Sequence, residues 1–246
     1  MFKIQKDLFY TVVPARSGSK SIRDKNISKI NGIPLIGYAL SIAKFVKRSK
    51  LTILSSDSKN YLKIGAKYSP NILHLRSKKN SSDKATDKDF FREIIIFLKK
   101  KNYLIPEFFI LLRPNTPNRI LDELNDSVET FFKIRKKFSS MRSISKMSET
   151  NYKTFEIKKN ILCTAFSKSL NIDQFNGPRQ SYNATYSANG LVDILKTKNL
   201  LNGKTYGKKT MAYICKNNYI DIDYPQDLNY AKFVMKSKKY FKPWEK

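Results

Sequence analysis

A basic loop follows the first apolar run of the chain, in the stretch TVVPARSGSKSIRDKN. Its cations are Arg16, Lys20, Arg23 and Lys25. Cationic side chains and backbone N–H groups at the end of a strand form a natural site for phosphate groups. The loop lacks the Gly-Lys-Ser/Thr run of a P-loop, and Gly18 alone cannot make a GxGxxG pattern. The sequence therefore predicts a polyphosphate site built from side chains, with an ordinary basic surface loop as the alternative.

A pair of carboxylates lies near the other end, where IDIDYPQDL places Asp221 and Asp223 two residues apart. Side chains at positions i and i+2 of an extended segment point to the same face. Two carboxylates on one face suit Mg²⁺, which commonly binds one or two carboxylates together with substrate phosphates. The alternative is an exposed acidic turn before the next helix. The chain has only 20 acidic residues, and this pair is set among isoleucines, which favours the metal site.

The elements that must position these residues alternate regularly over the first half of the chain. Apolar runs of strand length occur at residues 9–13, 51–54, 71–75 and 107–112. Segments with one apolar helical face occur at residues 34–46, 60–68, 87–100 and 121–134. Such alternation predicts an α/β fold with a mainly parallel sheet covered by helices on both faces. Ligands of such sheets bind beyond the carboxyl ends of the strands, where the basic loop begins.

The pattern changes near Met141. Two short runs flank a Lys-Lys-Asn turn within residues 153–164 and predict a hairpin, followed by a polar, irregular stretch. Regular elements then return, with strands expected at residues 190–195 and 211–215 and a helix from Pro225. We therefore expect a single structural domain with an insertion, in which residues 1–140 and 187–246 form the core and residues 141–186 form an arm.

Composition limits the other possibilities. The chain has 48 basic residues and a formal net charge of +28, but the lysines are scattered in the manner of solvated helix faces. A basic pI is only the first of the observations that nucleic-acid binding requires, so we expect no nucleic-acid partner. No apolar run reaches the roughly 18 residues of a membrane span, and no signal peptide is evident. With two separated cysteines and no CxxC pair, a cytoplasmic location and no membrane partner are expected.

Six motifs in order give the sequence a resemblance to a known family. They are PARSGSKSIRDKNISKINGIPLIGYAL, SSD, an arginine followed by SSDKAT, LLRPNTPNR, PRQ followed by NG, and IDIDYPQDL. In the same order, they resemble six features of the acylneuraminate cytidylyltransferases, the CMP-sialic acid synthetases. Those features are PARxGSKGxxxKNxxxxxGxPLIxYxI, the end of the second strand, DTAS, LLQPTSPxR, PRQ…NG and IDIDTPxDL. The resemblance covers nearly the whole chain. It implies a Rossmann-like α/β sheet with a smaller arm that exchanges across a homodimer.

The resemblance also implies a reaction, in which CTP and a 2-keto sugar acid give a CMP-sugar and pyrophosphate with Mg²⁺. It assigns the triphosphate and ribose site to Arg16, Ser19, Lys20, Lys25 and Asn26, of which the cations neutralise charge as the anomeric hydroxyl attacks the α-phosphorus. It places Arg76 and Ala85 against the cytosine.

The acceptor and metal residues follow from the same resemblance. Asn189 would face the nucleotide or the sugar, and Arg179 with Gln180 of the PRQ motif would approach the sugar, with Arg179 in the partner's site. Asp221 and Asp223 would hold the metal. Asp223 is also our candidate for the group that accepts the hydroxyl proton through a water.

The sequence departs from the family pattern mainly in the acceptor half. Arg113 and Asn115 replace a glutamine and a threonine, and Asp193 stands where a tyrosine is common. Ser187 stands where a basic residue often occurs, whereas the nucleotide half differs only at Ser21. An arginine at position 113 could pair with a carboxylate of the substrate through two hydrogen bonds. We therefore expect CTP as the donor and a legionaminic- or pseudaminic-type nonulosonate, or another ulosonate, as the acceptor.

Two alternatives remain open on sequence grounds. One is a nucleotidyltransferase of the same architecture for a shorter ulosonate, against which the GSK-containing loop argues, because the eight-carbon relatives have a different opening. The other is a basic α/β protein that binds nucleic acid or has lost catalysis. Adding CTP and Mg²⁺ would not raise the thermal stability of a protein of this second kind.

Overall fold

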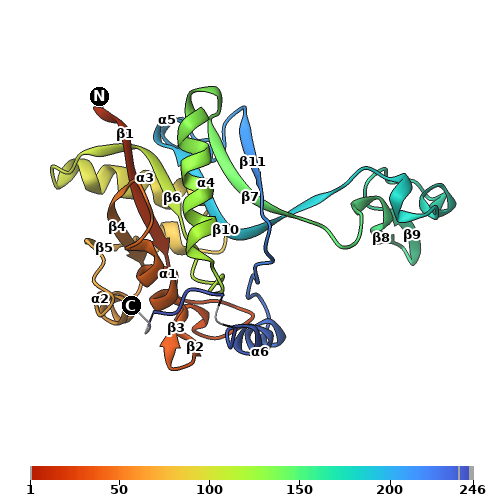
Figure 1. Cartoon of the computed structure of the whole chain (residues 1–246), viewed down its shortest axis with the longest axis horizontal. Coiled ribbons are helices and arrows are strands. Elements are labelled where there is room, and N and C mark those ends of the chain that lie inside the picture. Colours follow the sequence, from red (N-terminus) through yellow and green to blue (C-terminus); the bar gives the residue numbers. More distant parts are fainter. Residues whose placement is uncertain (1, 238, 244–246) are drawn as a thin grey trace.

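One central sheet organises the molecule, which we describe from a computed structural model over residues 2–237 and 239–243 (Figure 1). Its seven strands are β1 (Ile4–Pro14), β4 (Ser49–Ser56), β5 (Ile72–Leu75), β6 (Ile105–Leu111), β7 (Ser140–Lys146), β10 (Tyr186–Lys196) and β11 (Thr210–Ile214). Their spatial order is β11-β7-β10-β6-β1-β4-β5. Strand β1 pairs in parallel with β4 and β6, β4 with β5, and β11 with β7, whereas β10 is antiparallel to both of its neighbours. The expected mainly parallel sheet is confirmed.

Helices cover both faces of this sheet. They are α1 (Leu35–Ala43), α2 (Lys59–Ala66), α3 (Asp87–Lys100), α4 (Leu121–Ile134), α5 (Thr197–Leu201) and α6 (Pro225–Val234). Alternate residues of β1 enter different cores: Phe9 and Val13 pack in the cluster that contains α1 and α4, while Tyr10 and Val12 pack in the cluster that contains α3. Because residues 9–13 of β1 are buried on both faces, they form a nearly continuous apolar run. No helix of the described residues is long and apolar enough to span a bilayer.

The carboxyl ends of β1, β4, β5 and β6 meet at one edge of the sheet, because these strands are mutually parallel. The loops that carry Arg16, Arg76 and Arg113 therefore start side by side. A short ribbon of β2 (Lys29–Ile30) and β3 (Ile33–Pro34) follows the basic loop and leads into α1. The topology thus brings the predicted nucleotide residues to one place before any side-chain contact is considered.

An arm leaves the core between β7 and β10 and extends well away from the sheet (Figure 1). It contains the hairpin of β8 (Phe155–Lys158) and β9 (Ile161–Thr164), joined by Lys159 and Asn160 at positive φ. A small aromatic stack holds it together, since the ring of Tyr152 lies 4.6 Å from that of Phe166 and 5.4 Å from that of Tyr182. We expected the arm to begin at residue 141. It begins after Lys146, because residues 140–146 are a strand paired with β10 and β11.

His74 is the only histidine of the chain and lies buried on β5. Its Nδ1 is 3.0 Å from the hydroxyl of Ser55, and its ring makes an edge contact with Phe97 of α3. Burial lowers the pKa of His74 to about 4; the Glu93 carboxylate opposes this shift and the Arg76 guanidinium adds to it. The folded protein therefore holds this imidazole neutral at pH values where the unfolded chain protonates it.

We predict a loss of stability as the pH falls from about 6.5 to about 4, because only the unfolded state binds the proton in this window. At about 1.4 kcal/mol for each pKa unit, the full loss is about 3 kcal/mol. Urea unfolding at pH 7 and pH 4.5 should show a smaller difference in His74→Gln than in the wild type. Equal pH dependence in both proteins would show that His74 does not carry this effect.

Candidate active site

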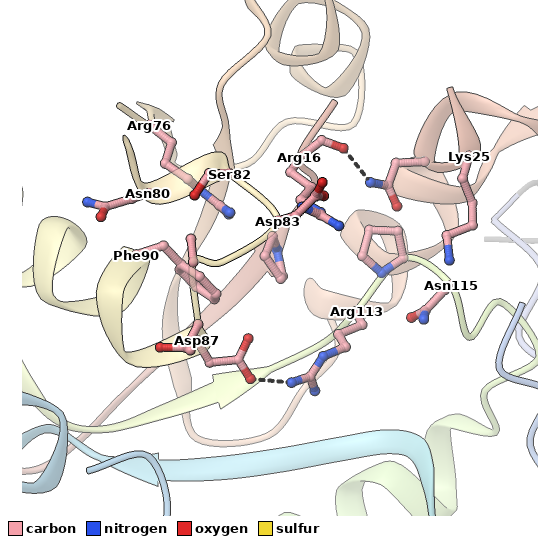
Figure 2. A pocket seen from close by; sticks show the side chains of 15 residues that line it. Arg16, Lys25, Arg76, Asn80, Ser82, Asp83, Asp87, Phe90, Arg113 and Asn115 are labelled. Atoms are coloured by element: carbon pink, nitrogen blue, oxygen red, sulfur yellow. Dashed lines mark hydrogen bonds and ion pairs between the residues drawn. The ribbon is translucent and has the colours of Figure 1, made fainter. Parts of the chain in front are cut away.

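A pocket of about 280 Å³ opens at the carboxyl edge of the sheet (Figure 2). Its walls come from the loop after β1, the segment between β5 and α3, and the loop after β6. Of the residues predicted from the sequence, it is lined by Arg16, Lys25, Asn26, Arg76, Ala85, Arg113 and Asn115. The side chains that Figure 2 labels converge on this space from opposite sides, so residues up to 99 positions apart in the chain share one pocket.

The basic loop is held by three hydrogen bonds, two to Asp57 directly after β4 and one within the loop. The backbone N–H and the hydroxyl of Ser17 donate to the two oxygens of Asp57, at 2.8 and 2.7 Å. The amide of Asn26 donates to the backbone carbonyl of Arg16 at 2.9 Å. Gly18 allows the turn between them, because its φ of 74° lies in the left-handed region. Asn26 thus supports the loop through its side-chain amide as well as lining the pocket.

An internal carboxylate holds the cations of this loop. The Arg16 guanidinium lies 3.0 Å from one oxygen of Asp83, and the Lys20 ammonium lies 2.6 Å from the other. These hydrogen bonds, that of Lys20 first, lower the pKa of Asp83. Lys20 and Ser19 do not line the pocket themselves, although Asp83 does. A polyphosphate that enters the pocket must therefore displace the Asp83 carboxylate to bind these two cations.

Arg76 forms a rigid wall on the opposite side of the pocket. Its Nε donates to the hydroxyl of Ser55 at 3.3 Å, and its Nη2 donates to the Ser55 carbonyl at 3.1 Å. Its guanidinium lies 4.3 Å from the centre of the Phe90 ring. Burial lowers the pKa of Arg76 to about 10, so the side chain remains a cation at neutral pH. With Ala85 beside it, this wall offers hydrogen-bond donors and a flat apolar surface, which suits a heterocyclic base.

The two late carboxylates border the same pocket. The Lys25 ammonium donates to Asp223 Oδ1 at 2.9 Å and to the carbonyl of Ile222 at 2.8 Å, and the amide of Asn115 donates to Asp221. Asp221 and Asp223 do not line the pocket themselves, but they contact Asn115 and Lys25, respectively, which do. Burial, followed by the Asp223 charge, raises the pKa of Asp221. The charge of Asp223 thus contributes to the raised pKa of Asp221.

The donor set at this point fits Mg²⁺. Asp221 and Asp223 supply two carboxylates, and the side-chain oxygen of Asn115 is buried without a hydrogen-bond partner. Within the described part of the chain, no group of three histidine, cysteine or acidic side chains could hold a metal. Mg²⁺ does not need such a cage, because substrate phosphates and water complete its octahedral coordination.

Arg113 has two internal partners instead of a free guanidinium. Its Nη1 lies 2.6 Å from Asp193, and its Nη2 contacts Asp87, the latter pair being drawn in Figure 2. Although burial alone would lower the pKa of Arg113, the two carboxylates raise it well above its usual value. A substrate carboxylate that bound here, as the sequence suggested, would have to compete with Asp87 and Asp193.

Three further predicted residues, Arg179, Gln180 and Asn189, are absent from the pocket lining. Arg179 and Gln180 line a separate hollow of about 360 Å³ at the arm, and Arg179 donates to the carbonyl of Met147. Asn189 is buried, and its amide donates to the hydroxyl of Ser145 and accepts from the backbone N–H of Leu191. Within one chain, Asn189 therefore supports the backbone, and the two arm residues are separate from the pocket.

Sequence reasoning gave no role to Arg119, which is fully buried and has no carboxylate partner among the described residues. Its guanidinium donates to four backbone carbonyls, those of Arg113, Thr116, Gly190 and Leu191. It thereby ties the loop after β6 to β10. The signal was its place at the end of LLRPNTPNR, a motif noted only as a pattern. Sequence reasoning also gave no role to eight residues that line the pocket, among them Asn80, Asp83, Asp87 and Phe90.

A mainly parallel sheet with a basic loop and a carboxylate pair around one pocket is the arrangement of a nucleotidyltransferase. Residues 10–174 match the family model described as Cytidylyltransferase. The chain belongs to this family, and it is a nucleotidyltransferase of the cytidylyltransferase type.

Individual relatives agree with this assignment. The chain is 28% identical over 228 residues to post-translational flagellin modification protein B of Campylobacter coli, covering 91% of this chain and 93% of that protein. It is 26% identical over 229 residues to N-acylneuraminate cytidylyltransferase of Escherichia coli, covering 92% of this chain and 52% of that protein. It is 27% identical over 222 residues to CMP-N,N'-diacetyllegionaminic acid synthase of Legionella pneumophila, covering 88% and 91%.

The fold is shared with solved structures. One is described as CMP:2-keto-3-deoxy-manno-octonic acid synthetase complexed with CTP. It aligns with a TM-score of 0.64 and 13% identity, covering 93% of this chain and 98% of that chain. At this identity the likeness establishes the architecture alone.

We predict that Arg119→Lys destabilises the protein by about 2–4 kcal/mol, because one ammonium cannot reach carbonyls on two segments and leaves buried acceptors unpaired. The free energy of unfolding from urea titration measures this loss. Arg48→Lys is a matched control, since Arg48 pairs with Glu129 away from the pocket, and should cost less than about 1 kcal/mol. A loss no larger than that of the control would contradict the role given to Arg119.

Proposed function

We propose that the protein transfers CMP from CTP to the anomeric hydroxyl of a sialic-acid-like 2-keto sugar acid and releases pyrophosphate. The observation that carries this proposal is the meeting of Lys25 with Asp223 beside a pocket that also contains Arg16 and Arg76. Membership of the cytidylyltransferase family supplies the donor nucleotide. The acceptor class rests on relatives named for an acylneuraminate and for a diacetyllegionaminic acid.

The nucleotide half of the pocket acts by positioning and by neutralising charge. Arg76 and Ala85 hold the cytosine, with the Phe90 ring behind the guanidinium. Arg16 and Lys20 leave Asp83 and bind the leaving phosphates, and Lys25 faces the α-phosphate. Phosphoryl transfer requires little covalent chemistry from a protein, so this fixed array of cations accounts for much of the catalysis.

Asp221 and Asp223, with the Asn115 oxygen, would hold Mg²⁺. The ion, when bound, neutralises phosphate charge and orients the nucleotide. Asp223 is also our candidate for the proton acceptor, because its carboxylate is exposed to solvent and is adjacent to Lys25. Before substrate binds, the Lys25 ammonium compensates the charge of this carboxylate.

Pyrophosphate release with each of four nucleoside triphosphates and a panel of 2-keto sugar acids tests the activity. We expect turnover with CTP and a nine-carbon acid, no turnover with the other nucleotides, and dependence on Mg²⁺. Asp221→Asn should lower kcat by about 100-fold or more while the protein stays folded, because one charged ligand is lost. Asp7→Asn, which removes an ion pair with Arg135 elsewhere, is the matched control.

Two results would contradict the proposal. One is an absence of pyrophosphate with every nucleotide and acid, together with no change in Tm on adding CTP and Mg²⁺, which would favour an inactive or nucleic-acid-binding protein. The other is turnover with an eight-carbon ulosonate alone, which would move the enzyme to the shorter-acid class. The proposal also places the enzyme in the cytoplasm, where Cys163 and Cys215 stay as the free thiols seen here.

We further propose that two chains form a homodimer through their arms. The arm exposes a row of large apolar side chains, among them Ile157 at 75% and Ile161 at 55% exposure. A large exposed apolar patch on a protein surface marks a site of contact with another molecule. In such a dimer Arg179 and Gln180 would reach the acceptor side of the partner's pocket, which accounts for their separation from the pocket of their own chain.

Light scattering after gel filtration should give twice the mass of one chain. The double variant Ile157→Asp and Ile161→Asp should give the mass of one chain, because two charges would be buried in the interface. Ile96→Asp, at an isoleucine of α3 that is 40% exposed, is the control and should remain dimeric. A wild-type protein that elutes as a monomer at micromolar concentration would refute the dimer.

A further inference from the structure

Four charged side chains form a connected row that starts at the pocket wall, where Asp87 and Arg113 lie, and continues behind it; we name this row the clasp: Asp87, Arg113, Asp193 and Arg142. Arg113 stands in the middle, with Nη1 at 2.6 Å from Asp193 Oδ2 and Nη2 in contact with Asp87. Arg142 Nε lies 3.4 Å from the other oxygen of Asp193. The hydroxyl of Tyr206 donates to Asp193 at 3.3 Å. The two cations and two carboxylates compensate one another.

The clasp joins four separate elements of the fold. Asp87 is in the first turn of α3, Arg113 follows β6, Arg142 is on β7 and Asp193 is on β10. The side chain of Asp193 is only 5% exposed, so its charge depends on the two arginines. Removing one partner of a buried pair is strongly destabilising, because the other charge is left without compensation. Asp193 therefore fixes the position of the Arg113 guanidinium.

Arg113 also faces the part of the pocket that is left for the acceptor. The base wall at Arg76 and the basic loop at Arg16 occupy two sides, as Figure 2 shows. In-line attack on the α-phosphorus requires the acceptor to enter opposite the leaving phosphates. The remaining wall carries Arg113, Asp87 and Asn115.

The charge balance decides what this wall can recognise. Two of the five N–H donors of an arginine are used by Asp193 and Asp87, and the guanidinium charge is compensated. What remains is a set of N–H donors beside a carboxylate acceptor, with no net positive charge. Such a surface matches a group that both donates and accepts hydrogen bonds, such as a hydroxyl or an acylamino group. Because its positive charge is already compensated, this surface gives little binding free energy to an anionic group of the substrate.

We propose that the clasp determines acceptor specificity by recognising a hydroxyl or acylamino substituent of the sugar acid, and that Asp193 positions Arg113 for this contact. The inference rests on the proposed function. A separate observation supports it: Arg113 and Asp193 are two departures from the family pattern, and in the folded chain they contact each other. Because these two residues form one ion pair, a single change in the surface that faces the acceptor accounts for both departures from the family pattern.

The test compares Arg113→Gln, Asp193→Asn, the double variant and Arg48→Gln as a matched arginine control. Acceptors that differ only in whether one carbon carries a hydroxyl or an acylamino group are assayed by pyrophosphate release. We expect Arg113→Gln to change the ratio of their kcat/KM values at least 5-fold and to leave the KM for CTP within 2-fold. Asp193→Asn should shift the same ratio in the same direction, because it frees Arg113. Arg48→Gln should change neither.

Stability supplies the second readout. Arg113→Gln leaves Asp193 under-compensated, so adding Asp193→Asn should recover part of the lost urea midpoint. The proposal is overturned if Arg113→Gln weakens all acceptors equally, including a 2-keto acid without either substituent, since Arg113 would then bind the common carboxylate. It is also overturned if Asp193→Asn leaves the acceptor ratio unchanged. An inactive wild type would instead refute the proposed function, and the specificity proposal with it.

Discussion

The structure of the site depends on one buried guanidinium. Arg119 donates to carbonyls of the loop after β6 and of β10, and so joins the two segments that carry Arg113 and Asp193. A buried cation without a carboxylate partner is tolerated only where dipoles replace its hydration, and four carbonyls provide them. The bulge of β10 at Gly190 makes this possible. Its φ of 74° turns the carbonyl toward Arg119, and a Cβ there would meet the Thr116 hydroxyl at 2.2 Å.

The charged side chains around the pocket follow a common pattern. Most basic side chains in or beside the pocket have an internal acid: Asp83 for Arg16 and Lys20, Asp223 for Lys25, and Asp87 with Asp193 for Arg113. Such pairs hold side chains in place before substrate arrives, which reduces the ordering cost of binding. The pairs differ in burial, and so in how readily they exchange. Asp83 is half exposed and can give way to phosphate, whereas Asp193 is enclosed and cannot.

Much of this architecture could be predicted from local patterns. The helices at residues 87–100 and 121–134 have the expected bounds, because their apolar faces repeat at helical spacing and polar residues mark their starts. Strand β7 was missed, because SMRSISK has only two apolar residues and its buried serines satisfy their hydroxyls in tertiary contacts. Seven of the residues that the motifs suggested line the pocket. Asp83 and Arg119 were missed, because the partner of a charged side chain is a property of the fold and not of its neighbours in sequence.

The order of the strands also has a consequence for biosynthesis. Strand β7 has hydrogen-bonded neighbours only in β10 and β11, and both follow it in the chain. A nascent polypeptide that has emerged as far as the arm therefore carries β7 with both edges unpaired, while β1, β4, β5 and β6 can already associate. The sheet becomes continuous only when β10 inserts between β6 and β7. Asp221 and Asp223 then reach Asn115 and Lys25 at a pocket whose lining residues were all translated before them.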